Sequence, residues 1–256
     1  MCGITGFFDP ARDSSDQKLT SVVTGMAAAI AHRGPDGHGI WIDETSGFAL
    51  GHRRLAIIDL SKDGAQPMAS ANGRYVLAYN GEVYNFAELR RELETKGHSF
   101  RGHSDTEVVL AGIVEWGFEA TIQRCTGMFA IALWDRETRS LTLARDRLGI
   151  KPLYYGWVGG VFMFGSELSA LEAHPVFKRE IDQNALALYM VRNCIPAPHS
   201  IYKGVQKLVA GASLTIDTKT AERGFLPPVK TFWSLADVVR DGMNNPFTGT
   251  EEQATD

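Results

Sequence analysis

Cysteine is scarce in this chain, and the few cysteines that occur form no paired pattern. Cys2, Cys125 and Cys194 are odd in number and show no CxxC spacing. Secreted domains held by disulfides need several paired cysteines, and CxxC motifs mark zinc or redox sites. The sequence therefore argues against a disulfide scaffold and favours a protein that works in a reducing compartment.

Long hydrophobic runs, basic clusters and a secretory leader are also missing. The longest apolar runs, such as residues 128–134, are far shorter than the ~20 residues that cross a bilayer. The N-terminus lacks the basic region and the apolar core of a signal peptide. With 26 basic and 30 acidic residues the formal net charge is −4, which argues against nucleic acid as a partner. We expect a cytoplasmic protein without a membrane or nucleic-acid partner.

Two blocks of β-rich segments, each followed by helical segments, make up most of the chain. Branched and aromatic residues between turn formers predict strands, and apolar residues at helical spacing predict helices. Expected strands span residues 2–8, 38–43, 48–60, 74–85, 127–135, 140–146, 151–158, 161–166, 206–211 and 212–218. Expected helices span residues 16–31, 86–96, 108–116, 167–174 and 182–191. This order predicts an α+β fold in which two packed sheets lie between helical layers.

Two helix starts carry capping signals. Asn85 precedes one helical segment and is followed by Glu88, and Ser104 precedes the next and is followed by Glu107. A Ser or Asn followed three residues later by Glu is typical of an N-cap. We expect helices to begin at both positions.

The end of the chain differs in character from the rest. Beyond about residue 222 the sequence has two adjacent prolines, an Asn-Asn-Pro and a polar end. Such composition is typical of a linker rather than of a packed element. We therefore expect a folded domain over residues 1–222 and a linker over residues 223–256, as though another domain should follow.

Cys2 is the first candidate for chemistry. Methionine is normally trimmed before a small second residue, and trimming would leave Cys2 with both a thiol and a free α-amine. An α-amine has an ordinary pKa of about 7.7–8.0, so at neutral pH part of it is unprotonated and can act as a base for the thiol. The alternative is a buried cysteine that behaves as a small hydrophobe, and Cys2 alone does not decide between them.

A second candidate is the Asn80–Gly81 pair in YNGEVYN (79–85). Asn-Gly after an alternating strand is a hairpin-turn signal. The functional alternative is an oxyanion hole, in which the Asn80 amide and the Gly81 N–H point at one developing negative oxygen. Both interpretations stay open on local grounds.

Charged residues near these segments admit both a structural and a functional interpretation. Arg53 and Arg54 are solvated surface residues by default, but an arginine at a strand end can clamp a carboxylate through two hydrogen bonds. Asp105 lies in the first turn of a capped helix, where any acid is stabilised by the helix dipole. HRGPDG (32–37) reads locally as a turn, and the histidines and Lys151 show no metal-ligand spacing.

Taken together, these segments resemble one family. The sequence is similar to asparagine synthetase (glutamine-hydrolysing), specifically to its N-terminal class II glutamine amidotransferase domain, from residue 1 to about residue 235. The motifs that carry the resemblance are MCGI, HRGPDG (32–37), RLAIID (54–59), YNGEVYN (79–85), SDTEV (104–108), RDRLGIKPLYY (145–155), SELSAL (166–171) and IPAPHSIYKGV (195–205).

The resemblance implies a four-layer αββα sandwich of the N-terminal-nucleophile hydrolase type. It implies that Cys2 is the nucleophile and that Asn80 and Gly81 form the oxyanion hole. It also implies that Arg54 binds the α-carboxylate of glutamine and that Asp105 binds its α-ammonium. The remaining pocket positions that it implies are Ile57, Ile58 and Glu82.

The implied reaction is hydrolysis of glutamine to glutamate and ammonia through a Cys2 thioester. In the family, ammonia passes to a synthetase domain that uses ATP and Mg²⁺ to amidate aspartate. That domain's SGGxDS loop is not in this sequence, so we expect no cofactor or metal in this chain and a synthetase domain in cis or as a separate subunit. The sequence leaves open a homodimer, another acceptor for the ammonia, an amidase for another amide and a non-catalytic glutamine sensor.

Overall fold

Two antiparallel sheets dominate the computed structural model, which describes residues 1–11 and 15–255. Within these residues each sheet has six strands. The first sheet has the order β10-β8-β9-β1-β3-β2, with β1 Gly3–Phe8, β2 Gly37–Asp43, β3 Phe48–Arg54, β8 Tyr154–Val158, β9 Val161–Gly165 and β10 Val205–Lys207. The second has the order β12-β11-β7-β6-β5-β4, with β4 Met68–Ala69, β5 Tyr75–Val83, β6 Gly127–Asp135, β7 Ser140–Arg145, β11 Ala212–Asp217 and β12 Lys230–Thr231.

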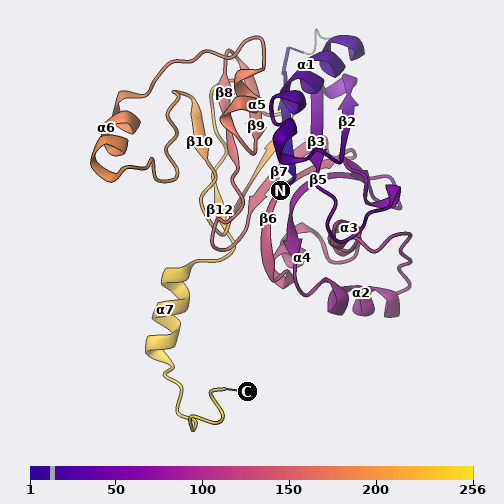
Figure 1. The fold of residues 1–256 in the computed structure, drawn as a ribbon, viewed down its shortest axis with the longest axis vertical. Helices are drawn as coiled ribbons and strands as arrows, with labels where there is room; N and C mark the ends of the chain where they lie inside the picture. Colours follow the sequence, from indigo (N-terminus) through magenta and orange to yellow (C-terminus); the bar gives the residue numbers. More distant parts are fainter. Residues whose placement is uncertain (12–14, 256) are drawn as a thin grey trace.

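Helices cover the outer face of each sheet (Figure 1). On the first sheet lie α1 (Asp16–Ala29) and α5 (Leu168–Glu172), and on the second lie α2 (Phe86–Thr95), α3 (Asp105–Trp116) and α4 (Phe118–Arg124). The resulting layer order is helix, sheet, sheet, helix. The expected αββα sandwich is therefore confirmed.

Apolar side chains fill the three spaces between these layers. The central space is filled from the inner faces of both sheets, and at its middle the Phe48 ring of β3 stacks on the Trp134 ring of β6, with centroids 4.1 Å apart. A second cluster lies between the second sheet and α2–α4, and a third between the first sheet and α1 and α5. Each sheet is therefore buried on both faces, which explains why its strands lack strict apolar–polar alternation.

A hydrogen bond joins the two sheets close to one end of the sandwich. His52 of β3 is fully buried, and its Nε2 donates to the carbonyl of Tyr79 in β5 at 3.1 Å. Burial lowers the pKa of His52 to about 4, so its ring is neutral at physiological pH. This contact holds β3 of the first sheet against β5 of the second, and the C-terminal ends of both strands meet at the same place.

Two local expectations need correction, and a third is confirmed. The strand expected over residues 48–60 ends at Arg54, and the chain continues as a loop. Asn85 does occupy the N-cap position of α2, but its side chain accepts from Thr126 N and donates to the Arg124 carbonyl, so it fixes the α4–β6 connection and not the helix start. Ser104 does cap α3 with its hydroxyl, as expected.

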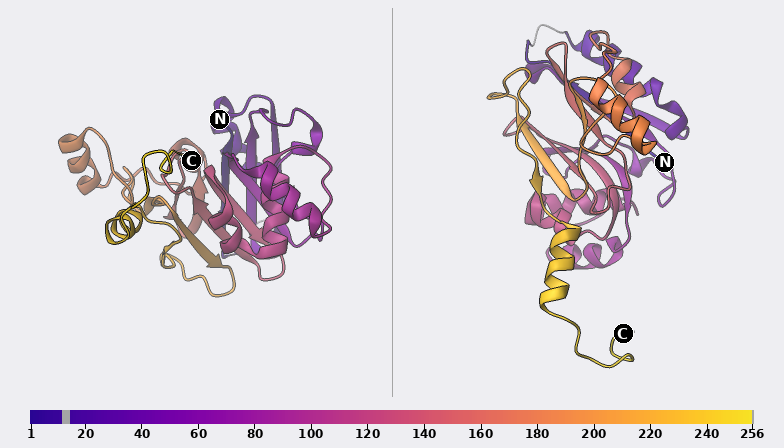
Figure 2. Two further views of the ribbon diagram at one scale, coloured as in Figure 1. Left: turned by 90° about the horizontal axis from the view of Figure 1, so that it is seen from below. Right: turned by 90° about the vertical axis from the view of Figure 1, so that its left-hand side faces the viewer.

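Contacts between the C-terminal part of the chain and the sandwich decrease along the sequence. Residues 230–231 form β12 beside β11, and Phe232 packs against the cluster under α2–α4. Helix α7 (Leu235–Asn244) buries no residue, and it extends away from the body in Figure 1 and in the right-hand view of Figure 2. Helix α6 (Gln183–Arg192) also projects from the body, on another side (Figure 1).

Candidate active site

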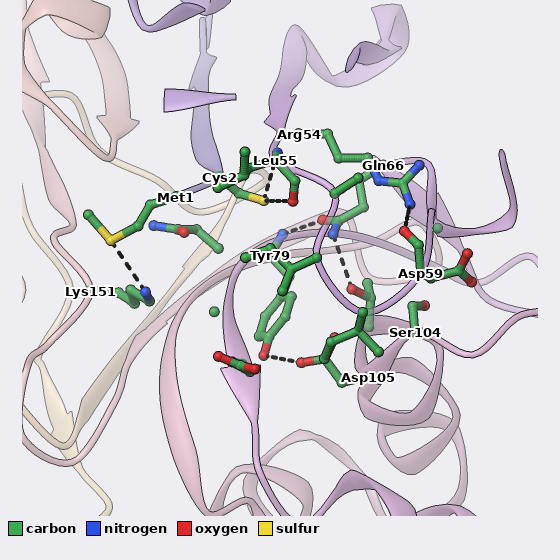
Figure 3. A pocket seen from close by; sticks show the side chains of 18 of the residues that line it. Met1, Cys2, Arg54, Leu55, Asp59, Gln66, Tyr79, Ser104, Asp105 and Lys151 are labelled. Carbon is green, nitrogen blue, oxygen red and sulfur yellow. Dashed lines mark hydrogen bonds between the residues drawn. The ribbon is translucent and has the colours of Figure 1, made fainter. Parts of the chain in front are cut away.

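One cavity at the end of the sandwich gathers the residues that the sequence singled out (Figure 3). It opens where β1 begins, β3 ends and β5 ends. The predicted residues that line it are Cys2, Arg54, Ile57, Ile58, Asn80, Gly81, Glu82 and Asp105. Segments that are separated by up to a hundred residues in the sequence therefore converge on one space.

Cys2 lies at the entry to β1, with its thiol turned toward the start of the loop after β3. The Leu55 N–H donates to Sγ at 3.3 Å, and Sγ lies 3.5 Å from the Leu55 carbonyl. Burial raises the pKa of the Cys2 thiol, and the hydrogen bond from Leu55 offsets only part of this effect. The thiol therefore needs a nearby base before it can act as a nucleophile.

The backbone of Cys2 is held by a residue that the sequence analysis left without a role. Arg33 is buried, its Nε donates to the Cys2 carbonyl at 2.9 Å, and its Nη1 pairs with Glu167 at 2.7 Å. It lies in the 3₁₀ turn Ala31–Arg33, inside the HRGPDG segment that reads locally as a turn. Only the packing of this turn against the chain start reveals the function of the arginine.

Asn80 and Gly81 lie inside β5, opposite Ala130 and Phe129 of β6, so the hairpin interpretation is wrong. Asn80 is almost fully buried, and within the described residues its Nδ2 has no hydrogen-bond partner. A Cβ on Gly81 would lie 2.4 Å from the Met128 carbonyl oxygen, so no larger residue fits there without a shift of the backbone. The strand thus presents an unused amide donor to the cavity.

Arg54, the last residue of β3, directs its side chain along the loop that follows. Its Nη1 donates to the Ser61 carbonyl at 2.7 Å and its Nη2 donates to the Asp59 carbonyl. The neighbouring Arg53 points elsewhere, because its Nε donates to the Ala27 carbonyl at the end of α1. Of the two arginines, only Arg54 lines the cavity.

Asp105 brings a carboxylate to the same cavity from the first turn of α3. Its Oδ2 accepts from the Tyr79 hydroxyl at 2.7 Å and from the Val83 N–H at 2.9 Å. Burial raises the pKa of Asp105, against these hydrogen bonds. The acid therefore both begins a helix and faces the cavity, so the two interpretations of it are compatible.

A buried aspartate that the sequence analysis did not select anchors the loop after β3. Asp59 accepts from Ser61 N at 2.7 Å through Oδ1 and from His103 N at 2.9 Å through Oδ2. A hydrogen bond from the Ser61 side chain has the largest effect and, together with the backbone hydrogen bonds from His103 and Ser61, lowers the pKa of Asp59 to about 2. The loop that carries Arg54's partners is thereby tied to the segment that leads into Asp105.

The arrangement suits nucleophilic attack on a small zwitterionic substrate. A partly buried thiol and a free amide donor lie in one cavity, and a guanidinium and a carboxylate line the same cavity. A charged pair of this kind can bind the two charged groups of a free amino acid, while the donor can stabilise a negative oxygen. Among the described residues no three His, Cys, Asp or Glu side chains form a metal site, and none of the described helices is long and apolar enough to cross a bilayer.

Comparison with known families supports this chemistry. Residues 1–233 match the family model described as glutamine amidotransferase domain. The asparagine synthetase (glutamine-hydrolyzing) 1 of Bacillus subtilis is 40% identical over 257 residues, covering 95% of this chain and 40% of that protein. A putative asparagine synthetase (glutamine-hydrolyzing) 2 of Methanocaldococcus jannaschii is 34% identical, covering 94% of this chain and 50% of that protein. The chain thus spans half or less of the length of these relatives.

A solved structure shares the fold. The glutamine phosphoribosylpyrophosphate amidotransferase of B. subtilis superimposes with a TM-score of 0.64 at 20% identity, covering 91% of this chain and 50% of that chain. At this identity the likeness concerns the fold alone. The expectation of an N-terminal-nucleophile hydrolase fold is confirmed.

Proposed function

Because the chain belongs to the glutamine amidotransferase domain family, we propose that it hydrolyses the side-chain amide of glutamine with Cys2 as the nucleophile. The observation that carries the proposal is the convergence of Cys2, Arg54, Asn80 and Asp105 on one cavity. Removal of Met1 exposes the α-amine of Cys2, which then serves as the base that the buried thiol needs.

The proposed reaction proceeds in two halves. The α-amine takes the thiol proton while Sγ bonds to the amide carbon of glutamine, and the oxygen of that amide becomes negative. Asn80 Nδ2 and the Gly81 N–H stabilise this oxygen. The α-ammonium returns its proton to the amide nitrogen, the C–N bond breaks and ammonia leaves. A water molecule, deprotonated by the α-amine, then adds to the thioester. The C–S bond breaks, the α-ammonium returns the proton to Sγ and glutamate is released.

The two charged ends of glutamine give the cavity its specificity in this proposal. Arg54 binds the α-carboxylate and Asp105 binds the α-ammonium, while the backbone at Ile57, Ile58 and Glu82 lines the space between. Asp105 must be ionised to bind an ammonium. Burial raises the pKa of Asp105, and the positive α-ammonium of bound glutamine lowers it again. Glutamine itself therefore favours the charged form of Asp105.

We further propose that the ammonia is used by a synthetase domain that binds ATP and Mg²⁺ and amidates aspartate. The support is the name of the relatives, asparagine synthetase (glutamine-hydrolyzing), together with the part of their length that this chain does not span. A cytoplasmic setting fits the free thiols of Cys2, Cys125 and Cys194.

The first test combines intact mass with a glutamine analogue that alkylates thiols. We expect a mass short by one methionine and a single adduct at Cys2, with glutamate released from glutamine by the unlabelled protein. Cys194 is an exposed free cysteine and serves as the internal control for unselective alkylation. An adduct at Cys194 instead, or undiminished hydrolysis by Cys2→Ala, would refute the role of Cys2. Processed protein that neither reacts nor hydrolyses glutamine would favour a sensing domain.

A further inference from the structure

Lys151 is a buried cation beside the chain start with an unusual partner. Only about 5% of the residue is exposed, and its side chain lines the same cavity as Cys2 and Asn80. Its Nζ lies 3.4 Å from Met1 Sδ, as Figure 3 shows. A thioether is a weak hydrogen-bond acceptor. Within the described residues Lys151 forms no ion pair.

The backbone of Lys151 is fixed, so the position of its side chain is not accidental. Asp146 is fully buried and accepts from Lys151 N, Ile150 N, Leu148 N and Phe129 N at 2.9–3.2 Å. The Arg145 guanidinium closes the same turn from the other side through the Lys151 carbonyl at 2.7 Å. A turn built this tightly fixes the point from which the lysine reaches the cavity.

Other charged groups lie around the chain start, and the negative charges of Glu82 and Asp146 act on Lys151, but among the described residues none forms an ion pair with it. Arg33 adds a second positive charge, which is paired with Glu167. The same glutamate also contacts His32. The Asp146 carboxylate is occupied by backbone N–H groups. Glu82 acts on Lys151 without forming an ion pair with it, and burial and Arg33 together lower the pKa of Lys151.

On the cavity side, Arg54 and Asp105 act on Cys2 with opposite sign. Their effects on the chain start therefore partly cancel. Lys151 is thus a positive charge without an ion-pair partner, among the described residues, and it lies beside Met1 and hence beside the future terminus. Glu82 lines the same cavity and brings a negative charge near it.

Removal of Met1 changes the surroundings of this lysine. The thioether leaves, and a new α-amine appears on Cys2, the residue next to it. A buried cation without a partner is costly to the fold and is characteristic of functional sites. A second positive charge close by would be more costly still, so the protonated form of the new amine is disfavoured.

We propose that Lys151 is a positioning residue for the hydrolysis reaction, whose charge keeps the Cys2 α-amine neutral at physiological pH. The inference rests on the proposed function, in which that amine takes the proton of the thiol. The same charge makes the α-ammonium a stronger acid when it must return its proton to the leaving nitrogen. Lys151 acts through the amine and needs no contact with glutamine.

The test compares Lys151→Met, which keeps the length of the side chain and removes its charge, with Lys151→Arg, which keeps the charge. Each protein is released from an N-terminal leader cut directly before Cys2, so that its terminus does not depend on the substitution. Cysteine labelled with ¹³C reports protonation of the Cys2 α-amine by the pH dependence of its Cα shift, with or without turnover. The same proteins are assayed for kcat/KM on glutamine between pH 5.5 and pH 9.

We expect the titration midpoint of the amine in Lys151→Met to rise by about one pH unit, as for loss of a nearby like charge. The acid limb of the pH profile of kcat/KM should move by the same amount. Below the midpoint of that limb kcat/KM should be about tenfold lower than in the parent, and at alkaline pH the two proteins should have the same kcat/KM. Lys151→Arg should keep the parent midpoint.

Two outcomes would overturn the proposal. The first is an unchanged amine midpoint in Lys151→Met, even if the rate falls evenly at all pH values, since that fall would be structural. The second is an equal displacement in both variants. A displaced midpoint in a protein that does not hydrolyse glutamine would instead leave the inference standing and reject the proposed function.

Discussion

Asn80 has a buried amide donor that fits the proposed reaction. Its Nδ2 is buried and has no partner among the described residues, and an unsatisfied buried donor costs about 1–3 kcal/mol. The position makes sense if the partner is an oxygen that becomes negative during a reaction.

We therefore expect Asn80→Ala to lower kcat by about 10²–10³-fold with a nearly unchanged KM for glutamine, because the donor acts mainly in the transition state. The free energy of unfolding should not fall by more than about 1 kcal/mol, since an unpaired donor is removed. The control is Asn85→Ala, in the same motif, whose side chain bonds to residues 124 and 126 and should leave kcat unchanged. Equal kcat values for the two variants would exclude Asn80 from the oxyanion hole.

Arg54 should affect binding rather than the rate. Charge-assisted hydrogen bonds contribute about 1.5–3 kcal/mol, so Arg54→Ala is expected to raise the KM for glutamine roughly 10–150-fold with a smaller effect on kcat. The neighbouring Arg53 is a matched control, because its side chain holds the end of α1 and does not line the cavity. Steady-state kinetics of both variants check this. A KM effect of Arg53→Ala as large as that of Arg54→Ala would contradict the assignment.

At the scale of elements, the loop over residues 55–64 connects the two sides of the cavity. It begins where β3 ends, receives two hydrogen bonds from Arg54, and is tied by Asp59 to the His103 backbone just before α3. The loop therefore sets the separation between the cationic and the anionic ends of the cavity. A change at its anchor should affect the binding of glutamine and the pH dependence of stability together.

The anchor gives a prediction with a defined pH window. The folded pKa of Asp59 is about 2, below the ordinary unfolded value of about 3.9. Its stabilising effect is therefore complete above about pH 4 and is lost as the pH falls toward about 2. Denaturant titrations at each pH give the free energy of unfolding of the parent and of Asp59→Asn. The parent should be the more stable of the two, and this difference should be largest above pH 4 and shrink below it. The KM of Asp59→Asn for glutamine should also rise.

Asp63→Asn, at an exposed position of the same loop, is the control for Asp59→Asn. A stability difference for Asp59→Asn that stays constant from pH 5 down to pH 2 would show that Asp59 is not the group responsible.

At the scale of the whole molecule, the boundary of the folded unit lies within the C-terminal segment. Phe232 packs on the cluster under α2–α4 and stacks with Phe129, with centroids 6.4 Å apart. The Trp233 N–H donates to the Gly211 carbonyl at 3.1 Å. Beyond these residues α7 exposes Leu235, Val238, Val239 and Met243. Packing against the sandwich therefore ends near residue 233, where the match to the family model also ends.

Two truncations test this boundary. A chain that ends at residue 234 loses only α7 and the tail, and its free energy of unfolding should stay within about 0.5 kcal/mol of the full chain, as for changes at exposed sites. A chain that ends at residue 229 also loses β12 and Phe232, and should lose about 2 kcal/mol or more through lost apolar burial. Urea denaturation of both chains measures the difference. Equal stabilities would place the boundary before β12.

Much of this protein was determined by the sequence alone. Local hydrophobic patterns and turn formers predicted most strands and helices, and the cap at Ser104, because these depend on residues close in the chain. The motif set predicted the four-layer fold and eight of the residues that line the cavity. Distant contacts decided what local patterns left open or predicted wrongly. Asn80 and Gly81 continue the expected strand because β6 pairs with it, whereas the expected side-chain cap at Asn85 is wrong because this side chain turns toward residues 124–126.

Only the tertiary structure decided the rest. It gave Arg54 and Arg53 different surroundings, because their side chains leave β3 on opposite sides. It brought Arg33 and Lys151 to the chain start from positions 33 and 151, and it gave Asp59 its anchoring contact 44 residues away. The physical reason is that burial, pairing and shifted pKa values arise from neighbours in space. The sequence thus determined which groups are available, and the folding of two sheets against each other decided which of them meet at Cys2.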